Sequence, residues 1–252
     1  MTNANDQKRV YKNKGRVIAH ATGAYLSYQY AIGNSRSFEE SILTTPIQEA
    51  MKHAFSTNIA IKFTHPILKN ARKNKKGRKS EVDFAALAPI YGKTIAAVEA
   101  KWAGSSHCTV ENITWDILRL ALMIENEDYE SFFLLAGKKK DIQKLFNSKK
   151  FLGEKNIKGK YNPILSIPNH GGGVLRLTNA FSDRKRMIHR IVYPYRDTKF
   201  SSLIKTGTPS VYPSTSTNGQ YQVYVWKIII PQGTPFITPS NTRIYGYNPD
   251  KK

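Results

Sequence analysis

The hydrophobic pattern in the first half of the chain changes from helical to strand spacing. Apolar residues within 38–55 recur every three to four positions, with Ser37 as a candidate N-cap and Pro46 as a point where the helix can restart. Residues 58–68 then alternate between apolar and polar side chains, which is the period of a strand. The pattern therefore predicts a helix followed by a strand.

Two short apolar runs follow, at residues 84–90 and 95–98, and the glycine-containing segment between them suits a hairpin turn. Apolar residues next recur at helical spacing through 113–124, with Thr109 as a candidate N-cap. Residues 131–136 form a last apolar run of strand length. The predicted order is helix, three strands, helix, strand, which is an α/β arrangement.

Beyond Gly137 the pattern is less regular. Residues 138–160 are rich in lysine and predict a short helix and a connecting loop, and a Ser/Thr/Pro/Gly-rich segment at 206–219 interrupts the later apolar runs. We expect strands at 174–177, 187–193 and 221–230. The chain then divides into a basic N-terminal segment (1–30), an α/β core (31–137) and a basic, aromatic, β-rich C-terminal extension (138–252).

Three charged residues interrupt the apolar runs of the predicted hairpin. Asp83 opens one run, and Glu99 and Lys101 follow the other, where a two-residue period places them on one face. Pairing of the two runs would bring both carboxylates and the ammonium together at the rim of the sheet. The alternative is that Asp83 is a turn acid and that Glu99 and Lys101 form a cross-strand pair at the surface. Against this alternative, a buried strand rarely carries such charges without a partner.

Carboxylate oxygens are the ligands that a hard divalent ion such as Mg²⁺ prefers, and the carbonyl of Ala100 is a further candidate ligand. Hydrolysis of a phosphodiester requires neutralised phosphoryl oxygens and an activated water, which a metal ion can supply. Lys101 could orient or deprotonate that water, or stabilise charge on the scissile phosphate. We therefore interpret Asp83, Glu99 and Lys101 as catalytic, with Asp83, Glu99 and Ala100 holding Mg²⁺.

This spacing resembles the PD-(D/E)xK nuclease superfamily, in which an Asp opens one strand and Glu-x-Lys ends the next. Here 15 residues separate Asp83 from Glu99, and Val82 replaces the proline of the family name. The resemblance covers residues 38–137 and implies a restriction-endonuclease-like core. It also implies a further metal ligand on the first helix, for which Glu40 is our choice; the rival positions are Glu39 and Glu49. Mn²⁺ is an expected substitute for Mg²⁺.

One departure concerns the recombination-exonuclease branch of this superfamily. That branch carries a Gln-x₃-Tyr motif on the helix after the lysine, and the predicted helix here has no glutamine. The sequence therefore argues against an exonuclease of that branch.

The charge of the chain predicts a polyanionic partner. It has 39 Lys and Arg against 18 Asp and Glu, a net charge of +21 and a pI of about 9.9. Directly before Asp83 lies a basic run, for which a solvated loop is the alternative to a clamp on a phosphate backbone. The nucleic-acid-binding candidates in this run are Lys73, Lys75, Lys76, Arg78 and Lys79.

A second basic cluster lies near Tyr193 and Tyr195. Cations fix phosphates, and aromatic rings can stack on unpaired bases, although these two tyrosines could equally pack a small extension. The nucleic-acid-binding candidates in this cluster are Arg184, Lys185, Arg186 and Arg190.

Other features of the sequence bear on the localisation and the oligomeric state of the protein. Cys108 is the lone cysteine and residues 2–16 are polar and basic, which predicts an intracellular, cytoplasmic protein without a secretory signal. No apolar run is long enough to cross a membrane. Cutting both strands of a duplex with one site per chain would favour a homodimer.

Together these observations predict a metal-dependent DNA endonuclease of restriction-like or phage-defence type, acting on double-stranded DNA. The alternatives are a structure-selective repair nuclease, an RNA nuclease, or a catalytically inactive nuclease-fold module that only binds nucleic acid. The intact set of Asp83, Glu99 and Lys101 argues against the inactive module.

Overall fold

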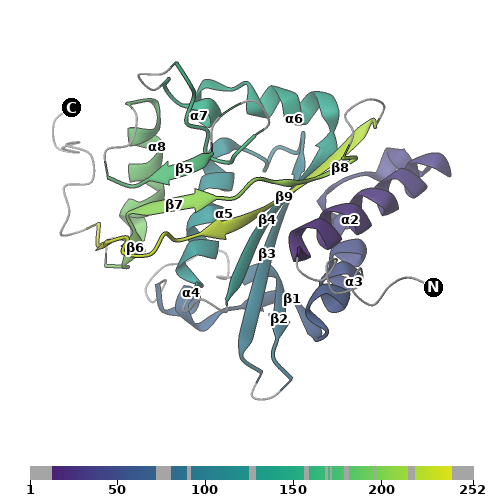
Figure 1. The fold of residues 1–252 in the computed structure, drawn as a ribbon, viewed down its shortest axis with the longest axis horizontal. Coiled ribbons are helices and arrows are strands. Elements are labelled where there is room, and N and C mark those ends of the chain that lie inside the picture. The colour runs from purple at the N-terminus through teal and green to yellow at the C-terminus, as the bar shows by residue number, and fades with distance from the viewer. Residues whose placement is uncertain are drawn as a thin grey trace.

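The computed structural model describes most of the chain as a mixed α/β protein (Figure 1). Its described residues contain seven α-helices, an eight-stranded mixed sheet that is mostly antiparallel, and a small two-stranded sheet. The described residues are 13–71, 81–89, 92–124, 129–155, 159–167, 170, 172–178, 182–195, 197–214 and 219–239.

The helices lie on both sides of the large sheet, and short 3₁₀ turns connect several of them. The 3₁₀ turns are η1 (Asn34–Ser37), η2 (Glu40–Leu43) and η3 (Tyr193–Tyr195). The α-helices are α2 (Lys14–Ala31), α3 (Thr44–Phe55), α4 (Pro66–Ala71), α5 (Val110–Leu122), α6 (Lys139–Phe146), α7 (Lys149–Leu152) and α8 (Ser182–Val192).

The large sheet has the strand order β1-β2-β3-β4-β9-β7-β5, with β8 paired to β9. Among the strands that the structure describes, only β3 and β4 run parallel, and α5 forms the crossover between them. The strands are β1 (Asn58–Thr64), β2 (Glu81–Leu87), β3 (Thr94–Ala103), β4 (Glu130–Lys138), β5 (Gly173–Arg176), β7 (Leu203–Thr206), β8 (Ser210–Tyr212) and β9 (Tyr221–Ile229); β6 (Phe200–Ser201) and β10 (Phe236–Ile237) form the second sheet.

The first half of the chain contains the predicted elements in the predicted order, with shifted ends. The first helix begins at Thr44, because residues 40–43 form a 3₁₀ turn. Strand β1 ends at Thr64, since Pro66 opens the short helix α4. Thr109 caps α5 as expected, and its side chain accepts a hydrogen bond from the backbone N–H of Asn112.

The predicted strand at 187–193 is wrong, because this segment lies in α8 and the turn after it. Its buried residues are Met187, Ile188, Ile191 and Val192, and this spacing fits one face of a helix rather than the alternation of a strand. The C-terminal half is therefore a mixture of helices and strands.

The predicted boundary at residue 137 is not a break in the sheet. Strand β9 pairs with β4 from Ser131↔Ile228 to Lys138↔Tyr221, and β7 and β5 continue the same sheet outward. The β-rich C-terminal extension therefore completes the central sheet instead of forming a separate unit.

Residues 14–30 of the predicted basic N-terminal segment form most of α2. Ile18 and Leu26 are fully buried on this helix. Gly23 allows a close approach, because a Cβ atom there would lie 2.0 Å from the ring of Tyr212. Residues 1–12 lie outside the described part of the chain.

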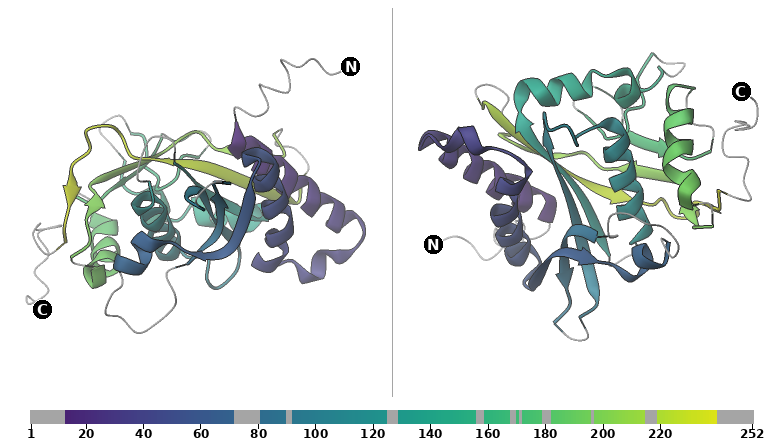
Figure 2. Two further views of the ribbon diagram at one scale, coloured as in Figure 1. Left: turned by 90° about the horizontal axis from the view of Figure 1, so that it is seen from below. Right: turned by 180° about the vertical axis from the view of Figure 1, so that it is seen from behind.

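Helices cover both faces of the sheet (Figures 1 and 2), and each face has its own hydrophobic core. On one face, Ile18 of α2 and Ile47 of α3 pack with Val98 of β3. On the other face, Ile117 of α5 and Ile188 of α8 belong to a larger cluster. Glu99 and Lys101 alternate with Val98 along β3, so they lie on the face that α5 covers.

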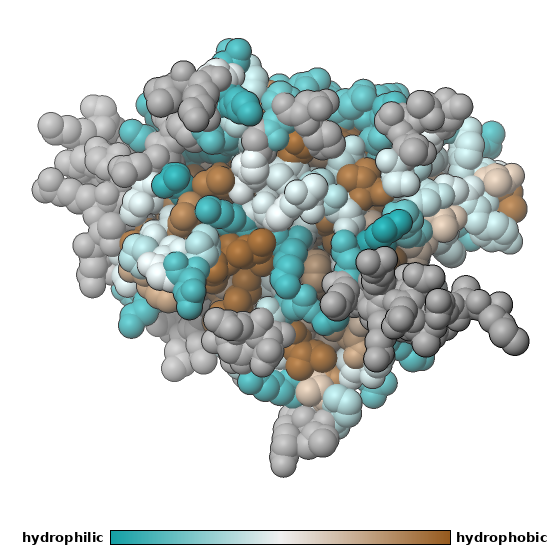
Figure 3. Space-filling model, viewed as in Figure 1, coloured by the Kyte–Doolittle hydropathy of each residue, from teal (hydrophilic) through white to brown (hydrophobic). Residues whose placement is uncertain are grey.

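Hydrophobic residues also reach the surface in separate patches, which hydrophilic side chains interrupt (Figure 3). No helix in the described residues is long and apolar enough to cross a membrane.

Glu130, the first residue of β4, links α2 to β9. Its carboxylate accepts hydrogen bonds from Lys14 of α2 and from Lys227 of β9, the second at 2.7 Å. Burial alone would raise the pKa of Glu130, but these hydrogen bonds and the lysine charges lower it overall. The ion pair therefore stabilises the attachment of α2 at neutral pH.

We expect Glu130→Gln to lower the free energy of unfolding at pH 7 by about 1 kcal/mol. Because the folded pKa lies below the unfolded value of about 4.3, this contribution is present above that value and is lost as the pH falls through the folded pKa. Urea unfolding of both proteins at pH 7 and pH 3 measures the effect. A difference that stays constant between these pH values would contradict it.

Candidate functional site

The β2–β3 hairpin brings the two predicted carboxylates together. Its register pairs Phe84 with Val98, and this places Asp83 opposite Glu99. The backbone N–H of Ala100 donates a hydrogen bond to Oδ2 of Asp83 at 2.9 Å. This bond fixes the Asp83 side chain against β3. Residues 90 and 91, between the two strands in sequence, lie outside the described residues.

Glu99 is 1% exposed, so its charge needs a partner. Arg119 of α5 supplies one, since its guanidinium donates to Oε1 of Glu99 and to the backbone carbonyl of Glu81. Burial raises the pKa of Glu99 well above its usual value, and the charges of Asp83 and Asp116 raise it further, against the opposing effect of Arg119. Because the charges of Arg119 and Lys101 do not cancel these effects, a further cation beside this carboxylate would be favourable.

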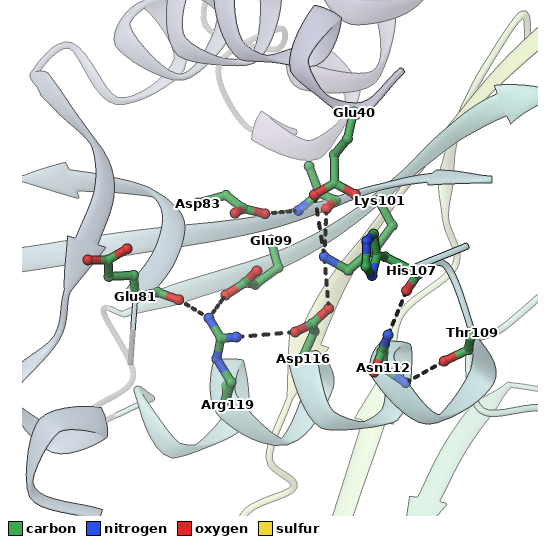
Figure 4. Close-up of polar contacts among 11 residues, drawn as sticks. Glu40, Glu81, Asp83, Glu99, Lys101, His107, Thr109, Asn112, Asp116 and Arg119 are labelled. Atoms are coloured by element: carbon green, nitrogen blue, oxygen red, sulfur yellow. Dashed lines mark hydrogen bonds and ion pairs between the residues drawn. The ribbon is translucent and has the colours of Figure 1, made fainter. Parts of the chain in front are cut away.

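Lys101 lies among acidic side chains from η2, β2, β3 and α5 (Figure 4). Its ammonium lies 3.3 Å from Oδ2 of Asp116, 3.7 Å from Oε1 of Glu40 and 3.2 Å from the carbonyl oxygen of Ala100. Burial alone would lower the pKa of Lys101, but the surrounding carboxylates, Asp116 foremost, raise it overall. Lys101 is therefore a partly buried cation in this cluster.

Asp116 and Arg119 of α5 complete the cluster, and neither was among the site residues predicted from the sequence. The two residues form an i,i+3 ion pair at 3.3 Å, and Asp116 is 4% exposed. The sequence feature that could have indicated them is their position on the helix, since both lie beside the buried apolar stripe of Ile113, Ile117 and Leu120. Charged residues next to such a stripe can face a buried site as well as solvent.

These residues line one cavity of about 530 Å³ between the β1–β3 strands and α5. This is within the range of about 300–1,000 Å³ that is common for small-ligand pockets. The ring of Trp115 stacks on that of Tyr195 at the cavity, with centroids 4.4 Å apart. The lining residues are Glu39, Glu40, Lys62, Leu68, Glu81, Asp83, Glu99, Lys101, Ser105, His107, Asn112, Trp115, Asp116, Arg119, Leu122 and Tyr195.

The three acids considered as a ligand from the first helix differ in position. Glu40 comes from η2 and contacts Lys101, and Glu39 also lines the cavity. Glu49 is exposed on α3 and does not line it. The structure thus brings Glu40 to the site, although its carboxylate lies beside the ammonium of Lys101.

The donor set has the chemistry of a hard cation site. Hydrogen bonds use Oδ2 of Asp83 and Oε1 of Glu99, and among the described residues nothing donates to Oδ1 or Oε2. The described residues hold no group of three or more His, Cys, Asp or Glu placed to bind one metal ion. Mg²⁺ suits this arrangement, since it is commonly bound by one or two carboxylates together with water and substrate phosphates.

The neighbouring thiol does not belong to this chemistry. Burial raises the pKa of Cys108 to about 12, so the thiol stays protonated at neutral pH.

We compared the chain with protein-family models, curated proteins and solved structures. No family model, curated protein or solved structure matches it. The function is therefore inferred from the residues and geometry of the site.

Arg184 is not available as a nucleic-acid contact, in contrast to the sequence prediction. It is 2% exposed, and its guanidinium donates to the backbone carbonyls of Lys150 at 2.9 Å and Phe151 at 2.5 Å. These bonds attach α8 to α7, because the four last carbonyls of a helix lack partners within the helix. Arg184 therefore has a structural role.

The other predicted nucleic-acid contacts have mixed outcomes. Arg186 is exposed and Lys185 is partly exposed on α8, whereas the exposed Arg190 forms a surface ion pair with Glu111. These three remain candidates. The upstream run of Lys73, Lys75, Lys76, Arg78 and Lys79 lies outside the described residues.

Proposed function

We propose that this chain is a metal-dependent endonuclease that hydrolyses phosphodiester bonds in DNA. The observation that carries the proposal is the convergence of Asp83, Glu99 and Lys101 on one cavity, at the spacing of the PD-(D/E)xK motif. Among the described residues, the order α3, β1, β2, β3, α5, β4, with the short α4 inserted, supports the resemblance to a restriction-endonuclease-like core. A restriction or phage-defence enzyme acting on double-stranded DNA fits this layout.

In this proposal the two carboxylates bind the metal ion, and Lys101 stabilises charge on the substrate. Asp83 and Glu99 would hold Mg²⁺ through the oxygens that their hydrogen bonds leave free, and the bound ion would neutralise phosphoryl oxygens and activate a water. The Ala100 N–H and Arg119 fix these two carboxylates, so neither has to reorient. Lys101 presents an ammonium to the same cavity, where it can donate to a phosphate oxygen or to the attacking water.

A structure-selective nuclease is the second candidate, and one observation favours it. Trp115 and Tyr195 place a stacked aromatic pair in the cavity that holds the carboxylates. Aromatic rings can stack on bases that have left a duplex. A substrate with an unpaired nucleotide beside the scissile bond would use this pair.

The test is cleavage of supercoiled plasmid, linear duplex, single-stranded DNA and RNA with Mg²⁺, with Mn²⁺ and with excess EDTA. We expect metal-dependent cleavage of DNA that EDTA abolishes, since the two carboxylates alone do not neutralise a phosphate. A preference for duplex supports the restriction-like enzyme, and a preference for substrates with unpaired nucleotides supports the second candidate. Binding of all four substrates without cleavage would contradict both and favour a binding module.

A further inference from the structure

Lys62 has an unusual backbone conformation in the middle of β1. Its φ angle is 52°, in the left-handed region that favours glycine. The pairs on either side, Ile61↔Phe84 and Phe63↔Val82, keep one register, so Lys62 lies opposite Asp83. The pairing of β1 with β2 is thus interrupted at the position that faces the first catalytic carboxylate.

A second residue with positive φ provides a comparison. Ser56, with a φ angle of 51°, is the C-cap of α3, where a left-handed residue commonly ends a helix. Lys62 has no helix end to explain its conformation. Strained residues persist where the surrounding structure holds them, and they are frequent at binding and catalytic sites.

Lys62 differs from Lys101 and Arg119, the other strongly basic residues that line the cavity, because its ammonium is not paired with a carboxylate of the described residues. Lys101 is paired with Glu40 and Asp116, and Arg119 is paired with Glu99 and Asp116. Lys62 lines the same cavity, is exposed, and forms no ion pair within the part of the chain that the structure describes. An anionic ligand entering the cavity can therefore meet this ammonium without breaking an ion pair.

We propose that Lys62 binds a phosphate of the nucleic-acid backbone beside the scissile bond, an inference that rests on the proposed function. Lys62 lies opposite Asp83 on the edge strand β1, which pairs directly with β2 of the hairpin that carries the carboxylates. An ammonium is a strongly hydrated point charge that recognises phosphate without base specificity. Lys62 thus positions the substrate and does not take part in bond cleavage.

The test separates the charge of Lys62 from its backbone strain. Lys62→Gln removes the charge and keeps the left-handed backbone, whereas Lys62→Gly removes both. Lys52→Gln, on the exposed side of α3, is the control for charge, and Ser56→Gly is the control for strain. Binding of a labelled oligonucleotide in EDTA, where no cleavage is expected, is followed by fluorescence anisotropy at several salt concentrations, and melting temperatures are measured in parallel.

Both Lys62 variants should bind about three- to tenfold more weakly, and their salt slope should fall by about 1, as for one lost phosphate contact. Lys62→Gly should at the same time melt a few degrees higher, as should Ser56→Gly without any loss of affinity. Equal affinity and salt slope for wild type and Lys62→Gln would overturn the proposal. Stabilisation of Lys62→Gly with unchanged binding would overturn it as well.

A neutral methylphosphonate at single positions of the oligonucleotide locates the contact. Substitution at one or two adjacent phosphates should weaken binding by wild type but not by Lys62→Gln, and a loss that is equal at every position would overturn the assignment. Cleavage by wild type with Mg²⁺ is measured separately. If that cleavage is absent, the proposed function fails, while the binding comparison still decides whether Lys62 contacts phosphate.

Discussion

Asp83→Asn is expected to lower metal-dependent cleavage at least about a thousandfold, which corresponds to about 4 kcal/mol of activation free energy. The carboxamide keeps the size of the side chain and can still accept the hydrogen bond from the Ala100 N–H, but it removes the negative charge beside Glu99. Single-turnover cleavage with Mg²⁺ measures the effect. Binding of DNA in EDTA should change little, because phosphate contacts come from other residues.

The matched control for this prediction is Glu49→Gln, which removes an exposed carboxylate outside the cavity and should leave cleavage unchanged. Glu40→Gln should lower the cleavage rate by less than Asp83→Asn does, since Glu40 lies beside Lys101 and reaches the cavity. Wild-type cleavage rates for Asp83→Asn, with an unchanged melting temperature, would remove Asp83 from the proposed catalytic site.

Arg119→Ala is expected to lower the free energy of unfolding by about 3–5 kcal/mol. The substitution leaves the buried carboxylates of Glu99 and Asp116 without their shared guanidinium, and it also removes the bond to the Glu81 carbonyl. An uncompensated buried charge is much more costly than a lost surface contact. Chemical unfolding at pH 7, followed by far-UV circular dichroism, measures the difference.

Arg190→Ala is the control for a guanidinium at the surface, because Arg190 and its partner Glu111 are 67% and 36% exposed. Its effect should stay within about 0.5 kcal/mol. Adding Glu99→Gln to Arg119→Ala should recover part of the stability, because the neutral side chain no longer needs a cation. A loss for Arg119→Ala as small as that for Arg190→Ala would show that the cluster does not depend on this residue.

The sequence predicted the centre of the site better than its surroundings. Asp83, Glu99 and Lys101 could be brought together because a hairpin and a two-residue period fix their relative positions over a short stretch of chain. Asp116 and Arg119 were missed because a charged helical residue has the same signature whether it faces solvent or a buried acid. Their role depends on how α5 packs against β3, which is a tertiary contact.

The same distinction explains the errors in the second half of the chain. Arg184 lies in a basic run typical of a surface, yet the open carbonyls of α7 bind its guanidinium. The apolar residues of α8 are few enough to suit a strand or one face of a helix, and packing against α5 and α7 decides between them. The pairing of β9 with β4 joins segments that are far apart in sequence, and local patterns carry no signal for it.

That pairing constrains how the protein is made. Strand β4 lies at the centre of the sheet, but its neighbour β9 leaves the ribosome only after residues 139–220 have been synthesised. Until then one side of an almost entirely apolar strand has unpaired backbone groups, which is the kind of edge that recruits other chains. Nascent chains of this protein should therefore depend on chaperones, and an interruption of translation before β9 should leave fragments that aggregate.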